Sequence, residues 1–142
     1  MIKEQYQRLI KELNPKPFLI NVSIIDNQLQ FDYYNHEIIT SYIMKDKIEI
    51  IKDKIYKKPT TEIKELNLGK IKITLNQALE ITNKELNDQV QRKIIILQNL
   101  DEPTWNISYI TTSFKILNIK INAINGKIIN KTYESILALK KS

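Results

Sequence analysis

The sequence has no cysteine, a single histidine and only two glycines in its 142 residues. Without cysteine the chain cannot form disulfides, Cys-ligated zinc sites or iron–sulfur clusters, and thiol catalysis is excluded. Its one histidine, His36, rules out a multi-His metal site and leaves at most one imidazole for acid–base chemistry. Two glycines, Gly69 and Gly126, are too few for a glycine-rich phosphate loop. No apolar run approaches the roughly 20 residues that span a bilayer.

The composition that remains is that of an ordinary globular protein, with 42% hydrophobic and 27% charged residues. It predicts a soluble α+β domain with no metal and no cofactor. The net charge of +6 is concentrated in the last third, since residues 103–142 carry six basic residues and one acidic residue. Such an excess favours an acidic protein, a nucleic acid or an anionic surface as the partner. An AT-rich genome, which enriches lysine together with isoleucine and asparagine, explains the same bias without any partner.

Residues 2–13 predict an amphipathic helix, because their apolar residues recur at helical spacing and Asn14-Pro15 ends the pattern. Arg8 and the other charged residues are expected to face away from the apolar stripe. The segment lacks the apolar core of a signal peptide. As given, the chain would therefore work in the cytoplasm, whereas a signal or anchor upstream would place it in the cell envelope or outside the cell.

Four strands are expected next, because apolar and polar residues alternate and turn residues separate the runs. The turn pairs are Asp26-Asn27 and Asn35-His36, so His36 is predicted to be an exposed turn residue rather than a ligand or a base. Of the neighbours Tyr33 and Tyr34, one should lie in the core and the other at the surface. The expected strands are residues 18–25, 29–33, 37–44 and 48–51.

The segment of residues 52–70 has a different character, with clustered charges and few apolar residues. We interpret it as the connection between two halves of the chain. Lysines surround Tyr56 in this segment, which resembles a small nucleic-acid patch of cations around an aromatic ring; they are Lys52, Lys54, Lys57 and Lys58. Asp53 interrupts the patch, and a solvated linker explains it equally well. The expected units are residues 1–58 and residues 71–142, joined by residues 59–70.

The second half opens with a capping box, in which Thr74 is the N-cap and Gln77 stands at the third helical position. A helix over residues 75–88 should pack one apolar stripe against a sheet, formed by Leu75, Ala78, Leu79 and Leu86. Asn125-Gly126 is the strongest hairpin dipeptide in the chain, since both residues accept a positive φ. The pattern leaves the structure of residues 133–139 open. The expected strands are residues 93–97, 104–110, 114–123 and 127–130.

Three stretches of this half resemble the PepSY family: ITLNQALEITNKEL, the strand opening Trp105-Asn106-Ile107, and ILNIKINAINGKIIN. The family pattern has a strand that enters a helix, a Trp that opens a strand, and a strand that ends in an Asp-Ala-x-Thr-Gly-Lys turn. Here Asn122 and Asn125 replace the aspartate and the threonine, and Gly126 is kept. The resemblance covers about residues 71–131. The first half repeats the order of helix and strands, so a degenerate second copy in residues 1–58 is a further hypothesis.

The resemblance implies a small module with one helix packed on an antiparallel sheet. With the repeated order of elements in the first half, the expectation is an α+β fold of helices packed on antiparallel meander sheets, PepSY- or cystatin-like, as two tandem α-βββ units. The resemblance also implies a non-enzymatic protein- or peptide-binding module, because PepSY modules occur in propeptides of secreted metallopeptidases, where peptidase inhibition is proposed. An open sheet face or an edge strand would bind the partner. The alternative is a basic nucleic-acid-associated protein, which requires convergence of Lys115, Lys120, Lys127 and Lys131. In a strand, Lys115 and Lys120 would point to opposite faces, which counts against convergence.

No catalytic set is predicted. Asp101-Glu102 precedes a proline in a turn, where exposure would keep both carboxyl groups chemically ordinary. The other acidic pairs, Glu62 with Glu65 and Glu80 with Glu85, are expected on polar faces. No histidine is suitably placed to activate Ser41, Ser108 or Ser113 as a nucleophile. Trp105 and Tyr109 share one strand face, where they either line a ligand groove or anchor the helix to the sheet, and the family pattern favours the anchor.

Overall fold

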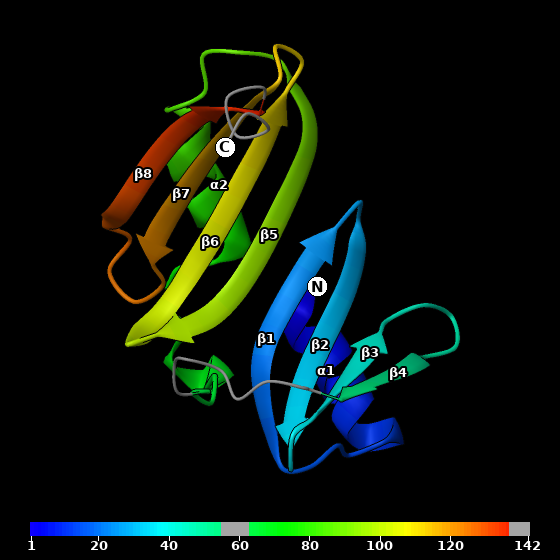
Figure 1. Cartoon of the computed structure of the whole chain (residues 1–142). Helices are drawn as coiled ribbons and strands as arrows, with labels where there is room; N and C mark the ends of the chain where they lie inside the picture. Colours follow the sequence, from blue (N-terminus) through cyan, green and yellow to red (C-terminus); the bar gives the residue numbers. More distant parts are fainter. Residues whose placement is uncertain (55–62, 137–142) are drawn as a thin grey trace.

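The computed structural model describes residues 1–54 and 63–136 of the chain. Each half of the described chain forms one α-helix followed by four antiparallel strands (Figure 1). The first half holds α1 (Ile2–Glu12), β1 (Phe18–Ile25), β2 (Gln28–Asn35), β3 (Ile38–Ile43) and β4 (Glu49–Lys54). The second half holds the 3₁₀-helix η1 (Leu68–Lys70), α2 (Leu75–Asn83), β5 (Val90–Leu100), β6 (Glu102–Thr111), β7 (Lys115–Asn122) and β8 (Ile128–Ser135). The α+β class is confirmed, and each half has the four strands that the alternation predicts rather than the three of an α-βββ unit.

The strands form one sheet in the order β4-β3-β2-β1-β5-β6-β7-β8. The two meanders are thus joined through their first strands, and β4 and β8 become the edges. Residues 21–25 of β1 pair with residues 94–98 of β5. Arg92 reinforces this junction, because its guanidinium donates to both carboxylate oxygens of Asp26, at 3.2 and 3.1 Å. The pairing that unites the halves is therefore non-local.

Both helices pack on the same face of the sheet, which we call the helix face; the other is the open face (Figure 1). The Tyr6 ring of α1 packs on Phe31 with centroids 5.8 Å apart, and Thr82 of α2 hydrogen-bonds to Tyr109. One register row on this face is apolar in every strand: Ile50, Tyr42, Phe31, Val22, Leu97, Trp105, Ile121 and Ile128. Its two end residues, on β4 and β8, are exposed, so the hydrophobic cover stops before both edges.

α1 forms where the apolar periodicity predicts it, and Leu9 is its fully buried contact with the sheet. Arg8 does not face away as expected. Its guanidinium donates to the backbone carbonyls of Lys45 and Asp46, at 2.9 and 2.7 Å, and so holds the turn between β3 and β4. A long side chain at the boundary of the stripe can reach a neighbouring turn, which helical spacing alone does not indicate.

Part of the expected connection is packed between the halves rather than solvated. Leu66 is 3% exposed, and its amide donates to the Leu19 carbonyl at 2.8 Å. The Asn99 side chain donates to the Glu65 carbonyl at 3.0 Å. The boundaries at residues 1–58, 59–70 and 71–142 stay a prediction.

α2 begins with the predicted capping box, in which the Thr74 hydroxyl accepts from the Gln77 amide at 3.1 Å and the Gln77 side chain accepts from the Thr74 amide at 2.9 Å. The helix ends at Asn83 instead of residue 88. Beyond it the amide of Glu85 donates to the Thr82 carbonyl, which tightens the chain into a turn. Ala78 and Thr82 are fully buried, whereas the three leucines of the predicted stripe, Leu75, Leu79 and Leu86, are only partly buried.

Replacing Leu79 with alanine is expected to lower the free energy of unfolding by about 2 kcal/mol, the lower end for a leucine truncation. The cost is at this end because Leu79 is partly buried and solvent fills some of the space it vacates. Urea unfolding would measure the change, with Leu13→Ala as the matched control, since Leu13 is exposed just after α1. A loss equal to that of the control would show that Leu79 is not part of the core.

Two hairpin turns have the positive backbone angles that two-residue loops favour. Asp26 and Asn27 have φ of 52° and 64°, as predicted. The turn between β2 and β3 lies one residue later than expected, at His36 and Glu37, with φ of 46° and 67°. His36 is exposed at its tip, which confirms its predicted place.

The loop between β7 and β8 differs from the predicted two-residue hairpin. Gly126 has a positive φ of 79°, but Asn125 does not have one. The Asn122 side-chain oxygen organises the loop by accepting from the amides of Ile124 and Asn125, at 2.8 and 3.2 Å. β8 then continues to Ser135, well past the expected residues 127–130, because its backbone stays paired with β7.

Candidate functional site

β8 is an edge of the sheet formed by the described residues. It pairs with β7 on one side, and no strand of the described residues pairs with its other side (Figure 1). Its residues are exposed along almost the whole strand, with Ile129 55% and Tyr133 47% exposed. A free edge presents backbone N–H and C=O groups that can pair with an added strand. β4, at the opposite end of the described sheet, is exposed in the same way.

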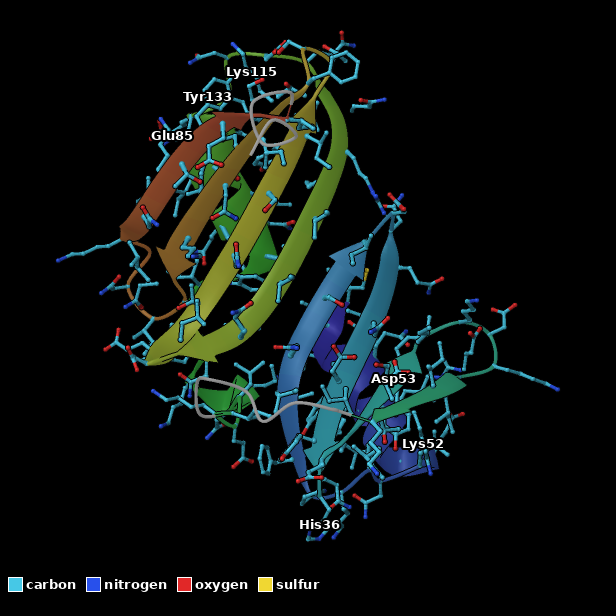
Figure 2. The ribbon with its side chains drawn as sticks, in the orientation of Figure 1. His36, Lys52, Asp53, Glu85, Lys115 and Tyr133 are labelled. Atoms are coloured by element: carbon cyan, nitrogen blue, oxygen red, sulfur yellow. The ribbon has the colours of Figure 1, made fainter. Side chains whose placement is uncertain are left out.

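A shallow pocket of about 90 Å³ lies beside β8 on the helix face. Leu86, Leu117 and Tyr133 supply apolar walls, and Glu85, Asp88 and Lys131 supply charged ones. Figure 2 shows Glu85, Lys115 and Tyr133 at the same end of the second half. Pockets for small-molecule ligands are usually about 300–1,000 Å³. This pocket therefore suits a side chain of a partner better than a metabolite.

Charged groups around the pocket are largely engaged with one another. The Lys131 ammonium donates to the Glu85 carboxylate at 2.8 Å, and the Lys115 ammonium lies 5.2 Å from the centre of the Tyr133 ring. The Ser113 hydroxyl donates to Asp88, and this bond is the main reason why the pKa of the Asp88 carboxyl is lowered. The backbone amide of the next residue and the charge of Lys115 lower the pKa further.

Replacing Ser113 with alanine is expected to raise the pKa of Asp88 toward its ordinary value, because the largest stabilising bond to the carboxylate is lost. Since the folded-state pKa is the lower one, this carboxylate contributes stability above its ordinary pKa, and the contribution is lost as the pH falls through the lowered value. An NMR pH titration of the Asp88 carboxyl would measure the shift. Ser108→Ala is the control and should leave that pKa unchanged, because Ser108 contacts Asn118 instead.

The four lysines of the nucleic-acid hypothesis are not brought together. Lys131 is paired with Ile119 and lies on the helix face with Lys115. Lys120 is paired with Asn106 on the open face. Lys127 lies in the loop at the far end of β7 from Lys115. Strand alternation and strand length thus separate the charges.

The other lysine cluster is only partly described. Register places Lys52 and Lys54 on the helix face of β4 and Asp53 on the open face (Figure 2). Tyr56, Lys57 and Lys58 lie outside the described residues.

The candidate acid–base and nucleophilic residues lie apart. His36 is at the β2–β3 turn, far from Ser113, and Figure 2 shows it at the opposite end of the molecule from Lys115. Residues 1–54 and 63–136 contain no group of three or more His, Asp or Glu that could hold a metal ion. Of the serines, Ser41 is buried in β3, and the Ser108 hydroxyl accepts a hydrogen bond from the Asn118 side chain. Of the glutamates, Glu65 and Glu80 are exposed, and Glu62 lies outside the described residues.

Asp101 is not as ordinary as its exposure suggested. Its carboxylate accepts a hydrogen bond from Lys64, and this bond and the charge of Lys64 lower the pKa of Asp101. The neighbouring Glu102 accepts from the Asn122 side chain. These contacts join the β5–β6 turn to the connection and to β7. Lys64 is distant in sequence from Asp101, so residue order alone could not indicate the pair.

Trp105 is the centre of a second group of contacts, around the entry to α2. It is 2% exposed, and its indole N–H donates to the Ile73 carbonyl at 2.9 Å. The Ala123 carbonyl accepts from the amides of Lys72 and Ile73, at 3.0 and 2.9 Å. Tyr109, on the same strand face, is also buried, and of the neighbouring tyrosines Tyr33 is buried and Tyr34 only half-buried. The anchor interpretation of Trp105 is confirmed, and the backbone bonds that complete it had no signal in the sequence.

This arrangement of an entry strand, a capped helix and an antiparallel meander is what the family comparison recognises. The model described as "Peptidase propeptide and YPEB domain" matches residues 72–132. That region of the chain is similar to the PepSY family. The match begins at the residues that bond to Ala123 and ends within β8, so it takes in the Trp105 contacts, α2 and most of the second meander.

The PepSY match does not extend into the first half, and the hypothesis of a second copy is not confirmed. The fold as a whole has a solved counterpart. A crystal structure of a protein described as a lipoprotein from Clostridium difficile 630 aligns with a TM-score of 0.71 at 16% sequence identity, over 94% of this chain and 92% of that one. At this identity the likeness concerns the fold alone. No curated protein shows significant sequence similarity to the chain. Neither helix of the described residues is long and apolar enough to cross a bilayer.

Proposed function

We propose that this chain is a non-enzymatic protein- or peptide-binding module that regulates a peptidase. The observation that supports it best is the free edge strand β8, which offers backbone pairing groups next to exposed apolar side chains. The PepSY match adds the class of partner, since the matched family is described by its occurrence as a peptidase propeptide.

The geometry favours an interaction surface over chemistry. The buried groups of the helix face are packed against one another, as in the Trp105 and Thr82 contacts. Several exposed ionisable groups are held in surface pairs such as Lys131 with Glu85 and Arg92 with Asp26. Such pairs are ordinary surface features, and they do not supply the matched acid and base that catalysis at neutral pH requires.

The proposal is tested with thermolysin, a zinc metallopeptidase, and with an array of unstructured synthetic peptides. Calorimetry would detect a complex with the enzyme, and hydrolysis of a small chromogenic peptide would report inhibition. We expect binding to the enzyme or to a subset of the peptides. Absence of both would contradict the proposal.

Single-stranded DNA belongs in the same experiment as the probe of the alternative function. We expect weak, non-selective binding that disappears between low and physiological salt, because separated surface lysines contribute only counterion release. Sequence-selective binding at physiological salt would favour a nucleic-acid-associated protein and would count against the peptide-binding module.

A further inference from the structure

We propose that β8 is the docking edge and that its partner is an extended acidic peptide, which adds to the sheet as a further strand. The inference rests on the proposed function and makes it more specific, by stating the chemistry of the partner and that it adds to β8 as a strand.

The first support is the unfinished hydrophobic face at β8. On β7, Ile121 and Leu117 are buried, whereas the residues paired with them on β8, Ile128 and Tyr133, are 42% and 47% exposed. The cover supplied by α2 therefore ends one strand short of the edge. An added strand would lay its alternate side chains beside these two residues and next to the pocket that Tyr133 lines.

The second support is charge. Lys120 lies on the open face of β7, paired with Asn130 of β8, and Lys127 lies in the loop directly before β8. Neither ammonium has an ion-pair partner in the described part of the chain. A strand added beside β8 would carry its open-face side chains past Asn130, one strand away from Lys120. A carboxylate beside Asn130 would complement Lys120, and one opposite the start of β8 would complement Lys127. Glu134 shares the open face near the other end of β8, so a carboxylate is disfavoured at that end.

The other edge lacks this preference. β4 carries two lysines, one glutamate and one aspartate, so its charges balance, and Glu49 is already paired with Lys45 at 2.9 Å. β8 carries Lys131 and Glu134, and the neighbouring Lys120 and Lys127 give this edge its positive excess. Opposite charge on the partner is what the edge accommodates.

The experiment uses three synthetic peptides of equal length and the same alternating apolar pattern, with glutamate, glutamine or lysine at the polar positions. Fluorescence anisotropy gives the affinities, and NMR-detected amide exchange locates the bound strand. We expect the glutamate peptide to bind most tightly and to protect amides of β8. The double variant Lys120→Gln/Lys127→Gln should weaken its binding about fivefold, the effect of two exposed ion pairs. The matched control, Lys52→Gln/Lys54→Gln on β4, should leave the affinity unchanged.

Equal affinities for the three peptides, protection confined to β4, or equal losses in both double variants would each overturn the acidic-edge proposal. If thermolysin forms a complex but no peptide protects β8, this inference is wrong and the proposed function stands. If neither the enzyme nor any peptide binds, both are wrong. Displacement of a bound peptide from β8 by single-stranded DNA at physiological salt would show that the edge takes polyanions in general and would likewise overturn it.

Discussion

Replacing Trp105 with alanine is expected to lower the free energy of unfolding by about 3–5 kcal/mol, the usual cost of deleting a large buried aromatic side chain. Trp105 is 2% exposed in the middle of the helix face, between Leu97 and Ile121 in the register row. Its loss leaves a cavity and also removes the indole N–H that donates to the Ile73 carbonyl at 2.9 Å. Guanidinium or urea unfolding would measure the change.

A second variant separates the cavity from the hydrogen bond. Trp105→Phe keeps an aromatic ring in the core but leaves the Ile73 carbonyl without its donor, which should cost about 1–3 kcal/mol beyond the change in volume. Because Ile73 leads into α2, we expect faster amide exchange in α2 for both variants than in α1. A loss for Trp105→Ala no larger than that of an exposed substitution would contradict the anchor role.

Replacing Gly126 with valine is expected to destabilise the fold by about 3 kcal/mol, because a β-branched residue is strained in the left-handed region. Gly126 has φ of 79°, and a Cβ at this position would lie 3.3 Å from Cδ1 of Ile73 and 3.6 Å from Cδ1 of Ile81. Thermal and denaturant unfolding would measure the effect. Loss of amide protection should concentrate in β8 and around Ala123, which the same loop positions.

Gly126→Asn is the variant with which Gly126→Val is compared. From the residue type alone it should be nearly neutral, since asparagine tolerates a positive φ. The contact with Ile73 makes a small cost more realistic, about 1 kcal/mol, because the end of that side chain must shift to admit a Cβ. If neither substitution lowered the free energy of unfolding, the loop would have to rearrange to admit a side chain. The hydrogen bonds from the Ile124 and Asn125 amides to the Asn122 side chain hold the loop in place, so we do not expect this result.

Much of the local structure follows from neighbouring residues alone. The Thr74–Gln77 capping box and the Asp26-Asn27 turn form as predicted, because each depends on side-chain and backbone geometry within a few residues. The period-two alternation places the buried β7 residues Leu117, Ile119 and Ile121 on one face for the same reason. Trp105 could be predicted as a core anchor because a large ring in a small domain has few other places to be buried.

Element lengths were less predictable where a distant partner decides them. β8 runs to Ser135 although its sequence has little apolar alternation, since backbone bonds to β7 carry it. α2 stops at Asn83 although Leu86 continues the helical pattern, since the chain turns there and Leu86 packs against the core from the turn. In both cases a non-local contact outweighs local propensity.

The candidate site depends almost wholly on tertiary structure. The sequence determined a basic, cysteine-free α+β chain with strands of predictable face, because composition and periodicity are local properties. Only the folded chain decided that β1 pairs with β5, and hence that β4 and β8 are the edges. That pairing depends on backbone hydrogen bonds between segments that are distant in sequence. Every residue type except proline can both donate and accept such bonds, so the residue types do not predict which strands pair. The same is true of Lys131 with Glu85 and Arg92 with Asp26, whose members meet only after the sheet has set its register.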